Sequence, residues 1–571
     1  RAIRNQFQAW VGSAPAELPV AVEPVTHCVL CAWDYHCTRE RRDVDHLSFV
    51  ANITRQQRQA LVEGGITTLQ ALGELAAPSF DGIKAGVLGR LQLQARLQLQ
   101  ARQESRLLHQ LLLPIETEEG LAALPEPSPG DLFFDLEGDP YALELGIEYL
   151  FGVADAGGEY SARWSLDRAS ERETFEWFMD FVMDRRQRYP DLHIYHYAPY
   201  EPTALKRLAG RYDNRIEELD QLLRGEVFVD LYRVVRQGLR ASVESYSIKK
   251  LESFYDFVRQ VDLKAAGDAM ASFEAWLELG GSSESSGTLL TDIEGYNRDD
   301  CISTLRLRDW LERLRAGLIQ AGTEVPRPVP AQAEPADVLA EKLEVVRALM
   351  TRLTDGVPEL PEQRTPEQQA RWLLAQSLEY HRRENKSLWW QYFAWCALSD
   401  DELIEDDSTL GGLEYLGAVG QVKQSMVHRY RFPPQDHAFK VDDTPHDPST
   451  GDGAGTVYAF DDIAHTIDLK RGKRSPAPHP HGLIPYEHVS DQVLRDSLLH
   501  LGQAVADSGL EQGAPYQAAM DLLLATPPRV GQPAGAPLTL SGEPVLDVAI
   551  RLGLALDHGV LPIQGPPGAG K

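Results

Sequence analysis

The stretch DLFFDLEGDP, residues 131–140, joins an apolar run to two evenly spaced acidic residues. Aromatic and aliphatic residues bounded by Gly and Pro are typical of a buried β-strand. Residues two positions apart on a strand face the same side, so Asp135 and Glu137 should share a face. Because paired carboxylates repel each other, we expect a divalent cation here, and oxygen ligands suit Mg²⁺ or Mn²⁺. A D-x-E pair also occurs by chance at strand ends.

Strand-like and helix-like segments alternate around this stretch, which predicts an α/β domain of about 190 residues. The expected strands are LFFDLEG, EYLFGVAD, YSARWSL, LHIYHY and VFVDLYRVV, and the expected helices lie near 170–186, 202–210 and 290–315. Pro-rich segments at 124–131 and 324–335 are expected to be linkers.

Further acidic residues follow at intervals that fit a shared site. EGYNRDDCISTLRLRDWLERL, residues 294–314, reads as a helix on which Tyr296 and Asp300 share a face. Glu201 lies in a turn after the strand LHIYHY, just before a helix. With Asp135 and Glu137, these acids could hold two metals that clamp the attacking and leaving oxygens of a phosphodiester. Tyr296 would position the attacking water or help to deprotonate it.

This order of motifs resembles the ribonuclease H-like 3′–5′ exonuclease superfamily, in its DEDD form with Tyr in the last motif. The resemblance covers about residues 128–316 and assigns Asp135 and Glu137 to the first motif and Tyr296 and Asp300 to the third. It implies metal-dependent cleavage of single-stranded DNA or RNA. The second motif normally ends in Asp, whereas this chain offers Glu201, which reaches one methylene further.

Other residues near these motifs have secondary roles in this interpretation. Asp230 resembles a recurrent Asp of the superfamily and is read as supporting rather than ligating. SIKKLE at 247–252 resembles the stretch that, in the superfamily, follows the strand with this recurrent Asp. Asp139 and Asp299 are neighbours that could substitute as ligands.

Three cysteines cluster in HCVLCAWDYHC, residues 27–37. The spacing of Cys28, Cys31 and Cys37 suggests zinc, with His27 or His36 as a fourth ligand, or an iron–sulfur cluster; free buried thiols are the alternative. The spacing also resembles the C-terminal cysteines of RecB-like nucleases that carry a [4Fe–4S] cluster. Cys301 and Cys396 are isolated and are expected to be core residues.

The chain ends on VLPIQGPPGAGK, in which Gly565 to Lys571 fit G-x-x-x-x-G-K after an expected strand at 560–564. Gly565, Gly568, Gly570 and Lys571 would bind the phosphates of ATP. GPPGAGK also resembles the first motif of superfamily 1 helicases of the Upf type. An upstream adenine-reading Gln is not evident, and the hydroxyl residue after the Lys is not in the sequence. We therefore expect ATPase activity only in a longer parent protein.

The sequence as a whole predicts an α/β multidomain chain that resembles a fusion of a RecB-like nuclease with a helicase. The expected parts are a RecB-like remnant with the Cys cluster (1–44), a helical region with a possible helix-hairpin-helix and linker (45–127), the ribonuclease H-like domain (128–316), a linker (317–360), a helicase accessory region (361–540) and the start of a P-loop domain (541–571). Within 45–127, the duplicated LQLQARLQLQAR is expected to be helical. Nucleic-acid repair or processing is the expected role.

Composition restricts the remaining alternatives. The net charge of −29 argues against a simple basic-surface nucleic-acid binder, although basic residues gather at 205–215 and 232–240. Five Cys in 571 residues indicate a reducing compartment, so we expect a cytoplasmic protein, and no apolar run is long enough to span a membrane. The other functions considered are a catalytically degenerate domain that binds nucleic acid and guides a helicase, and a hydrolase of small phosphoesters.

Overall fold

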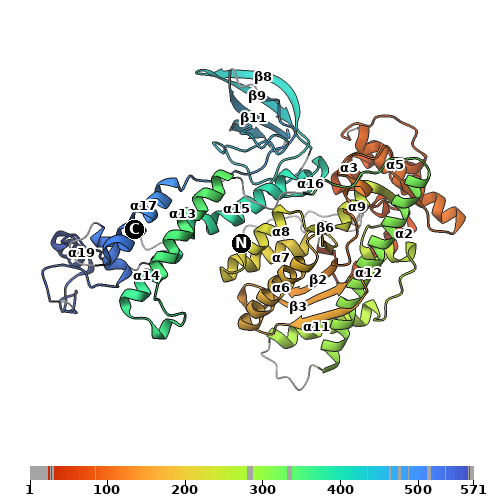
Figure 1. The fold of residues 1–571 in the computed structure, drawn as a ribbon. Coiled ribbons are helices and arrows are strands. Elements are labelled where there is room, and N and C mark those ends of the chain that lie inside the picture. Colours follow the sequence, from red (N-terminus) through yellow and green to blue (C-terminus); the bar gives the residue numbers. More distant parts are fainter. Residues whose placement is uncertain are drawn as a thin grey trace. The chain divides into compact units, whose positions relative to one another are not determined.

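The computed structural model divides the chain into two compact units, Arg1–Leu205 with Glu226–Pro330 and Lys206–Gly225 with Ala331–Lys571 (Figure 1). The residues that the structure describes are 23–25, 27–28, 31–83, 85–278, 287–330, 337–433, 435–461, 464–473, 477–486, 488–510, 516–533, 535–563 and 565. The finer domain boundaries expected from the sequence stay predictions.

A five-stranded mixed sheet forms the centre of the first unit, in the order β4-β3-β2-β5-β6. Strands β2, β3 and β4 pair antiparallel, and β5 and β6 continue the sheet parallel to β2. The strands are β2 (Leu132–Asp139), β3 (Ile147–Asp155), β4 (Tyr160–Trp164), β5 (Ile194–His196) and β6 (Phe228–Asp230). The expected α/β arrangement is therefore confirmed for this domain.

Helices cover both faces of this sheet, as neighbouring side chains on β2 demonstrate. Phe134 stacks on Phe178 of α6, with ring centroids 4.1 Å apart. Phe133 points to the other face, where it lies 4.9 Å from the guanidinium of Arg308 on α12. Because alternate residues share a face, Asp135 and Glu137 lie on the side that α12 covers. The helices around the sheet are α6 (Arg168–Arg188), α7 (Tyr200–Tyr212), α9 (Leu231–Gly238), α10 (Ile248–Leu251), α11 (Leu263–Glu278) and α12 (Gly287–Gln320).

The long helix α12 crosses β2 and β3 closely because β3 has a glycine at the crossing (Figure 1). Gly152 pairs with Asp135 in the antiparallel ladder. A Cβ atom at Gly152 would lie only 1.6 Å from Oδ1 of Asn297 on α12. The missing side chain therefore creates the space into which Asn297 fits.

Helices also precede the sheet in the first unit, and polar side chains hold the longest of them in place. The duplicated LQLQARLQLQAR lies within helix α5, as its residue types indicate. Gln94 donates to the carbonyl of Ala241 at 2.9 Å, and Gln98 donates to that of Phe49 at 2.7 Å. Further elements of this unit are α2 (Asp34–Asp43), α3 (Arg55–Glu63), α4 (Leu69–Glu74), α5 (Ala85–Glu104), β1 (His109–Leu111) and β7 (Leu239–Ala241), with 3₁₀ turns at Leu47–Phe49, Gly120–Ala123, Ala142–Glu144 and Glu252–Phe254.

Two local expectations from the sequence are wrong. VFVDLYRVV is not one strand, because Asp230 ends β6 and caps α9 by accepting from the amide of Tyr232 at 2.9 Å. The expected linker at 124–131 stays a prediction; it contains no helix or strand, and its last residue, Asp131, is buried and accepts from Arg308 at 2.8 Å. Among the described residues 560–563 no strand precedes the glycine-rich end. The sequence reading also missed α11.

The second unit contains helices and a separate antiparallel sheet, as the helical and strand-like patterns beyond residue 336 indicate. The sheet has the order β10-β11-β9-β8 and packs around Tyr430, Val457 and Leu469. Its elements are α8 (Ile216–Arg224), α13 (Asp337–Thr354), α14 (Pro366–Ser377), α15 (Tyr380–Cys396), α16 (Asp400–Glu405), β8 (Glu414–Val422), β9 (Ser425–Arg431), β10 (Thr456–Asp461), β11 (Thr466–Gly472), α17 (Gln492–Ser508), α18 (Gln517–Leu523) and α19 (Val545–Ala555), with a 3₁₀ turn at Pro361–Gln363. No helix among the described residues is both long and apolar enough to cross a membrane.

The crossing of α12 over the sheet can be tested by Gly152→Ala. The added methyl group must displace Asn297, so we expect the free energy of unfolding to fall by about 1–3 kcal/mol, as in other overpacked cores. Gly267→Ala is the matched control, because a Cβ at this α11 position meets no atom within 4 Å and alanine favours a helix. Chemical denaturation of both variants measures the difference. Equal stability of the two variants would contradict the close crossing.

Candidate functional site

Three carboxylates from two elements meet on the α12 side of the sheet. Asp135 and Glu137 come from β2, and Asp300 comes from α12. One oxygen of each lies within 4.8 Å of the others. The pairing of β2 with β3 shifts register between Glu137 and Gly138, a local irregularity of the kind that often lies beside functional sites. The structure thus brings together three of the four predicted acids.

Asn297 fixes the first of these carboxylates. Its Nδ2 donates to Oδ2 of Asp135 at 2.7 Å and to the Asp135 carbonyl oxygen at 3.2 Å. The hydroxyl of Tyr160 on β4 donates to Oδ1 of Asn297 at 2.8 Å, which sets the orientation of the amide. Helix α12, β2 and β4 are therefore joined through one side chain, in the space that Gly152 leaves open.

Burial and mutual repulsion make the charged form of these acids costly. The pKa of Asp135 lies well above its usual value, because the carboxyl is buried and because Glu137, Asp300 and Glu201 are close. Burial, with the charge of Asp300, raises the pKa of Glu137 to about 8. A cation placed among the three oxygens would offset both effects. The donor set of carboxylate oxygens fits Mg²⁺ or Mn²⁺.

Asp300 also contacts two basic side chains. Arg259 forms an ion pair with Oδ1 of Asp300 and another with Glu252 at 2.6 Å. The Nζ of Lys249 lies 3.6 Å from Oδ2 of Asp300. Asp299 holds the backbone beside Arg259 by accepting from the amides of Gln260 and Val261 at 2.8 and 3.0 Å.

Tyr296 lies next to the same basic groups. The ammonium of Lys249 is 4.9 Å from the centre of its ring, and the guanidinium of Arg259 is 5.4 Å from it. Burial and the charge of Asp300 raise the pKa of Tyr296 to about 12. Near neutral pH the phenol therefore keeps its proton, so it can donate a hydrogen bond. Of the two roles expected for Tyr296, this favours positioning a water over removing its proton.

Glu201 lies apart from the three-carboxylate group, at the start of α7. Its charge contributes to the raised pKa of Asp135, so it is near the site. Its Oε2 is 3.5 Å from Nδ1 of His196, which is closer to the carbonyl oxygen of Ala198 at 2.6 Å. This buried Oε2 has no hydrogen-bond partner among the described residues. An orphaned, buried carboxylate oxygen fits a site that accepts a cation or a water.

The remaining acids near the motifs serve the backbone. Asp230 caps α9 and accepts from the amide of Ala198 at 2.9 Å, which steadies the turn before Glu201. Asp139 accepts from the amide of Tyr141 at 2.8 Å. Asp299 is engaged by the loop beside Arg259. None of these three belongs to the three-carboxylate group.

Sequence reasoning missed four residues that shape the site: Asn297, Lys249, Arg259 and His196. Asn297 is three residues before Asp300 on α12 and so shares its helix face, a signal that the helical spacing contained. Lys249 lies in SIKKLE, a stretch noted only for its resemblance. Arg259 reaches the site from an irregular segment after the 3₁₀ turn, which no periodic pattern marks.

Comparison with known families gives one match, and it covers the sheet and its helices. Residues 132–312 match the family model described as the RNase H superfamily. This segment is an RNase H superfamily domain. The matched residues include the three carboxylates, Glu201 and the basic pair. Neither curated proteins nor solved structures give a match to the chain.

Two other predicted sites lie outside the RNase H domain. Cys28, Cys31 and Cys37 form no disulfide among the described residues, where the three carboxylates make the only close group of three or more His, Cys, Asp or Glu ligand atoms. A zinc or iron–sulfur site at the cysteines therefore stays a prediction. Of the proposed phosphate-loop residues, Gly568, Gly570 and Lys571 lie outside the described part of the chain; Gly565 alone is described.

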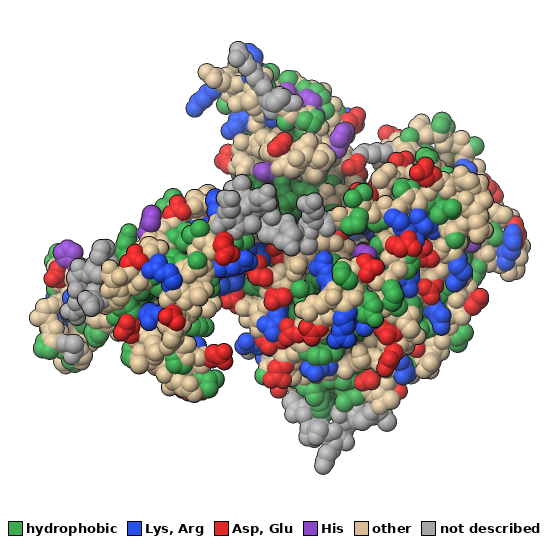
Figure 2. Space-filling view, viewed as in Figure 1, with side chains coloured by type: hydrophobic (Ala, Val, Ile, Leu, Met, Phe, Trp, Pro, Cys, Tyr) green, Lys and Arg blue, Asp and Glu red, His purple; other side chains and the backbone are tan. Residues whose placement is uncertain are grey.

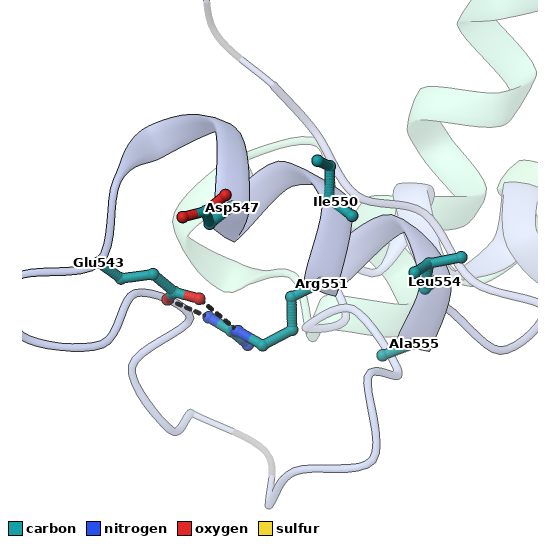
Figure 3. A pocket seen from close by; sticks show the side chains of 6 residues that line it. All are labelled: Glu543, Asp547, Ile550, Arg551, Leu554 and Ala555. Carbon is teal, nitrogen blue, oxygen red and sulfur yellow. Dashed lines mark hydrogen bonds and ion pairs between the residues drawn. The ribbon is translucent and has the colours of Figure 1, made fainter.

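Neither the surface charge drawn in Figure 2 nor the depression drawn in Figure 3 indicates a second site. On the face drawn in Figure 2, basic and acidic side chains of the first unit intermingle. Figure 3 shows a shallow depression beside α19 in which Arg551 donates to Glu543 at 2.6 and 2.7 Å. Because this guanidinium is already paired, the depression is not assigned a ligand.

Metal binding by the carboxylates should depend on pH. Acids whose pKa is raised on folding stabilise the fold below their unfolded values, and this contribution is lost as pH rises through about 8 for Glu137. A metal ion must displace the same protons, so Mn²⁺ should raise the melting temperature more at about pH 9 than at about pH 6. Calorimetry with and without Mn²⁺ measures the shift, and Asp135→Asn should reduce it at both pH values. A shift that is unchanged in Asp135→Asn would place the metal elsewhere.

Proposed function

We propose that the RNase H domain, residues 128–316, hydrolyses phosphodiester bonds of single-stranded nucleic acid from an end. The observation that carries this proposal is the convergence of Asp135, Glu137 and Asp300 to within 4.8 Å beneath α12. Two of these carboxylates, Asp135 and Glu137, have a raised pKa, and such acids are costly to a fold and suit a site that binds cations. The family match over residues 132–312 supports a nuclease-type domain.

The side chains of this chain then have separate roles. Asp135, Glu137 and Asp300 would hold Mg²⁺ or Mn²⁺, with Glu201 as the fourth acid nearest the site. A bound divalent ion neutralises charge on the phosphate and favours the ionised form of the attacking water. Asn297 keeps Asp135 in one orientation. Tyr296, protonated at neutral pH, would donate a hydrogen bond that orients the water.

A second function, a domain that binds nucleic acid without cutting it and guides a helicase, is favoured by one feature. Glu201 replaces the usual Asp of the second motif and lies beside His196, outside the three-carboxylate group. A site that lacks its fourth acid could keep substrate affinity and lose turnover. The cleavage assay below separates the two functions.

We also propose that this domain is fused to an ATP-dependent helicase. The support is the G-x-x-x-x-G-K sequence at 565–571 and its resemblance to the first motif of Upf-type helicases. The Cys cluster at 28–37 supports a RecB-like nuclease end with a [4Fe–4S] cluster or zinc. Iron, sulfide and zinc analysis of the anaerobically purified protein tests the metal site at the cysteines. Absence of all three would favour free thiols.

Cleavage should require the three-carboxylate group. Wild-type protein should shorten end-labelled single strands in Mg²⁺ or Mn²⁺, and Asp135→Asn should remove most of the activity, by a factor of about 10² or more, because the remaining acids hold a cation poorly. Asp184→Asn is the control, since this exposed acid lies on α6 outside the site. Product lengths on sequencing gels measure rate and direction.

Two outcomes would overturn the nuclease proposal. Equal cleavage by the wild type and Asp135→Asn would place the activity at another site or in a contaminant. Strand binding by both proteins, without cleavage by either, would favour the guiding domain instead. Binding is measured by fluorescence anisotropy in the same buffers.

A further inference from the structure

The charge at this site is asymmetric. Among the described residues, Asp300 is the one carboxylate of the three with ion pairs, to Arg259 on one oxygen and to Lys249 on the other. The charge of Lys249 also reaches Asp135 and Glu137, where it acts to lower the pKa against the effect of burial. Glu201, the acid that would help to hold a second metal ion, lies outside the close group and beside His196. The carboxylates therefore converge on one cation position, and the chain supplies its own positive charge on the Asp300 side.

The two basic residues differ in exposure. Arg259 is 8% exposed and is ion-paired with both Glu252 and Asp300 through Nη2, while its buried Nη1 has no hydrogen-bond partner among the described residues. Lys249 is 33% exposed, and its Nζ lies 3.6 Å from Asp300, slightly beyond a short hydrogen bond. It projects from α10, a short helix that the buried side chains of Ile248 and Leu251 anchor. An ammonium has three N–H donors, so contacts with Asp300 and the Tyr296 hydroxyl leave Lys249 able to bind an additional anionic partner.

We propose that Lys249 is a catalytic residue that contacts a non-bridging oxygen of the scissile phosphate. This inference rests on the nuclease function proposed above and identifies how its site binds substrate. Lys249 supplies beside Asp300 the positive charge that a second divalent ion would otherwise provide. Arg259 is a positioning residue that holds Asp300.

The chemical step is ordinary hydrolysis. The oxygen of a water forms a bond to phosphorus while the bond from phosphorus to the leaving oxygen breaks, and a proton from the water reaches the leaving oxygen through solvent. Lys249 keeps its protons throughout. Its charge stabilises the negative charge that grows on the phosphoryl oxygens, an effect that a fixed donor exerts mainly in the transition state.

If Lys249 has this role, removing its charge should lower kcat and raise the affinity for a metal ion. Loss of the ammonium removes transition-state stabilisation, so kcat should fall. The same charge repels a metal ion bound to Asp300, so its removal should strengthen metal binding. A purely structural role for Lys249 would instead weaken metal binding as Asp300 lost its position.

The experiment compares Lys249→Met, Lys249→Arg and Lys250→Met in the whole chain. Lys250 is the matched control, because it is the next residue of the same short helix and is exposed. In Lys249→Met we expect kcat to fall by about 10²–10³, the loss seen when one donor to a developing oxyanion is removed. KM should change little, and Mn²⁺ binding, followed by electron paramagnetic resonance, should become several-fold tighter. Lys249→Arg should recover part of kcat, and Lys250→Met should match the wild type.

Failure of this inference can be told apart from failure of the proposed function. If the wild type cleaves strands and Lys249→Met cleaves them equally well, Lys249 does not touch the reacting phosphate. If kcat and Mn²⁺ affinity fall together, Lys249 only positions Asp300, and the inference is again wrong. A wild type that cleaves no strand in any metal would defeat the nuclease proposal and the role of Lys249 with it.

Discussion

The contact between Asn297 and Asp135 is the constraint on which the rest of the domain depends. It brings α12 against the sheet at one register, because the amide reaches both the carboxylate and the carbonyl of the same residue. It is possible only where β3 has no side chain, at Gly152. Once α12 is fixed there, helical geometry places Asp300 one turn further along the helix, beside Glu137. The position of the site thus follows from a packing requirement of the core.

The same packing creates the electrostatic difficulty of the site. Burial beneath α12 removes water from Asp135 and Glu137 and raises the pKa of both. On the Asp300 side, Arg259 and Lys249 reduce the repulsion, and Glu252 in turn neutralises Arg259. The domain therefore disfavours negative charge on Asp135 and Glu137 and balances that of Asp300 with ion pairs. The buried acids therefore destabilise the fold, and a bound cation would offset part of that destabilisation.

The sequence predicted what local periodicity can encode and missed what tertiary contacts decide. Asp135 and Glu137 are two positions apart on a strand, and Tyr296 and Asp300 are four apart on a helix, so each pair could be placed on a face without a structure. Arg259 could not be predicted, because its place depends on a loop tied to Asp299. VFVDLYRVV was misread for a related reason: its apolar residues fit a strand, but the capping bond of Asp230 begins a helix. The N-terminal cysteines and the phosphate loop remain predictions from sequence spacing alone.

The position of Glu201 reflects both the packing and the charge of the site. A glutamate reaches one methylene further than an aspartate would, and Glu201 starts from the first turn of α7, beside a turn steadied by Asp230. Its orphaned oxygen is buried next to His196, whose Nδ1 already has the carbonyl of Ala198 as a close partner. The extra length therefore does not bring this carboxylate into the group of three. The ammonium of Lys249 offsets negative charge at Asp300, while Glu201, the fourth acid, lies outside the group of three carboxylates.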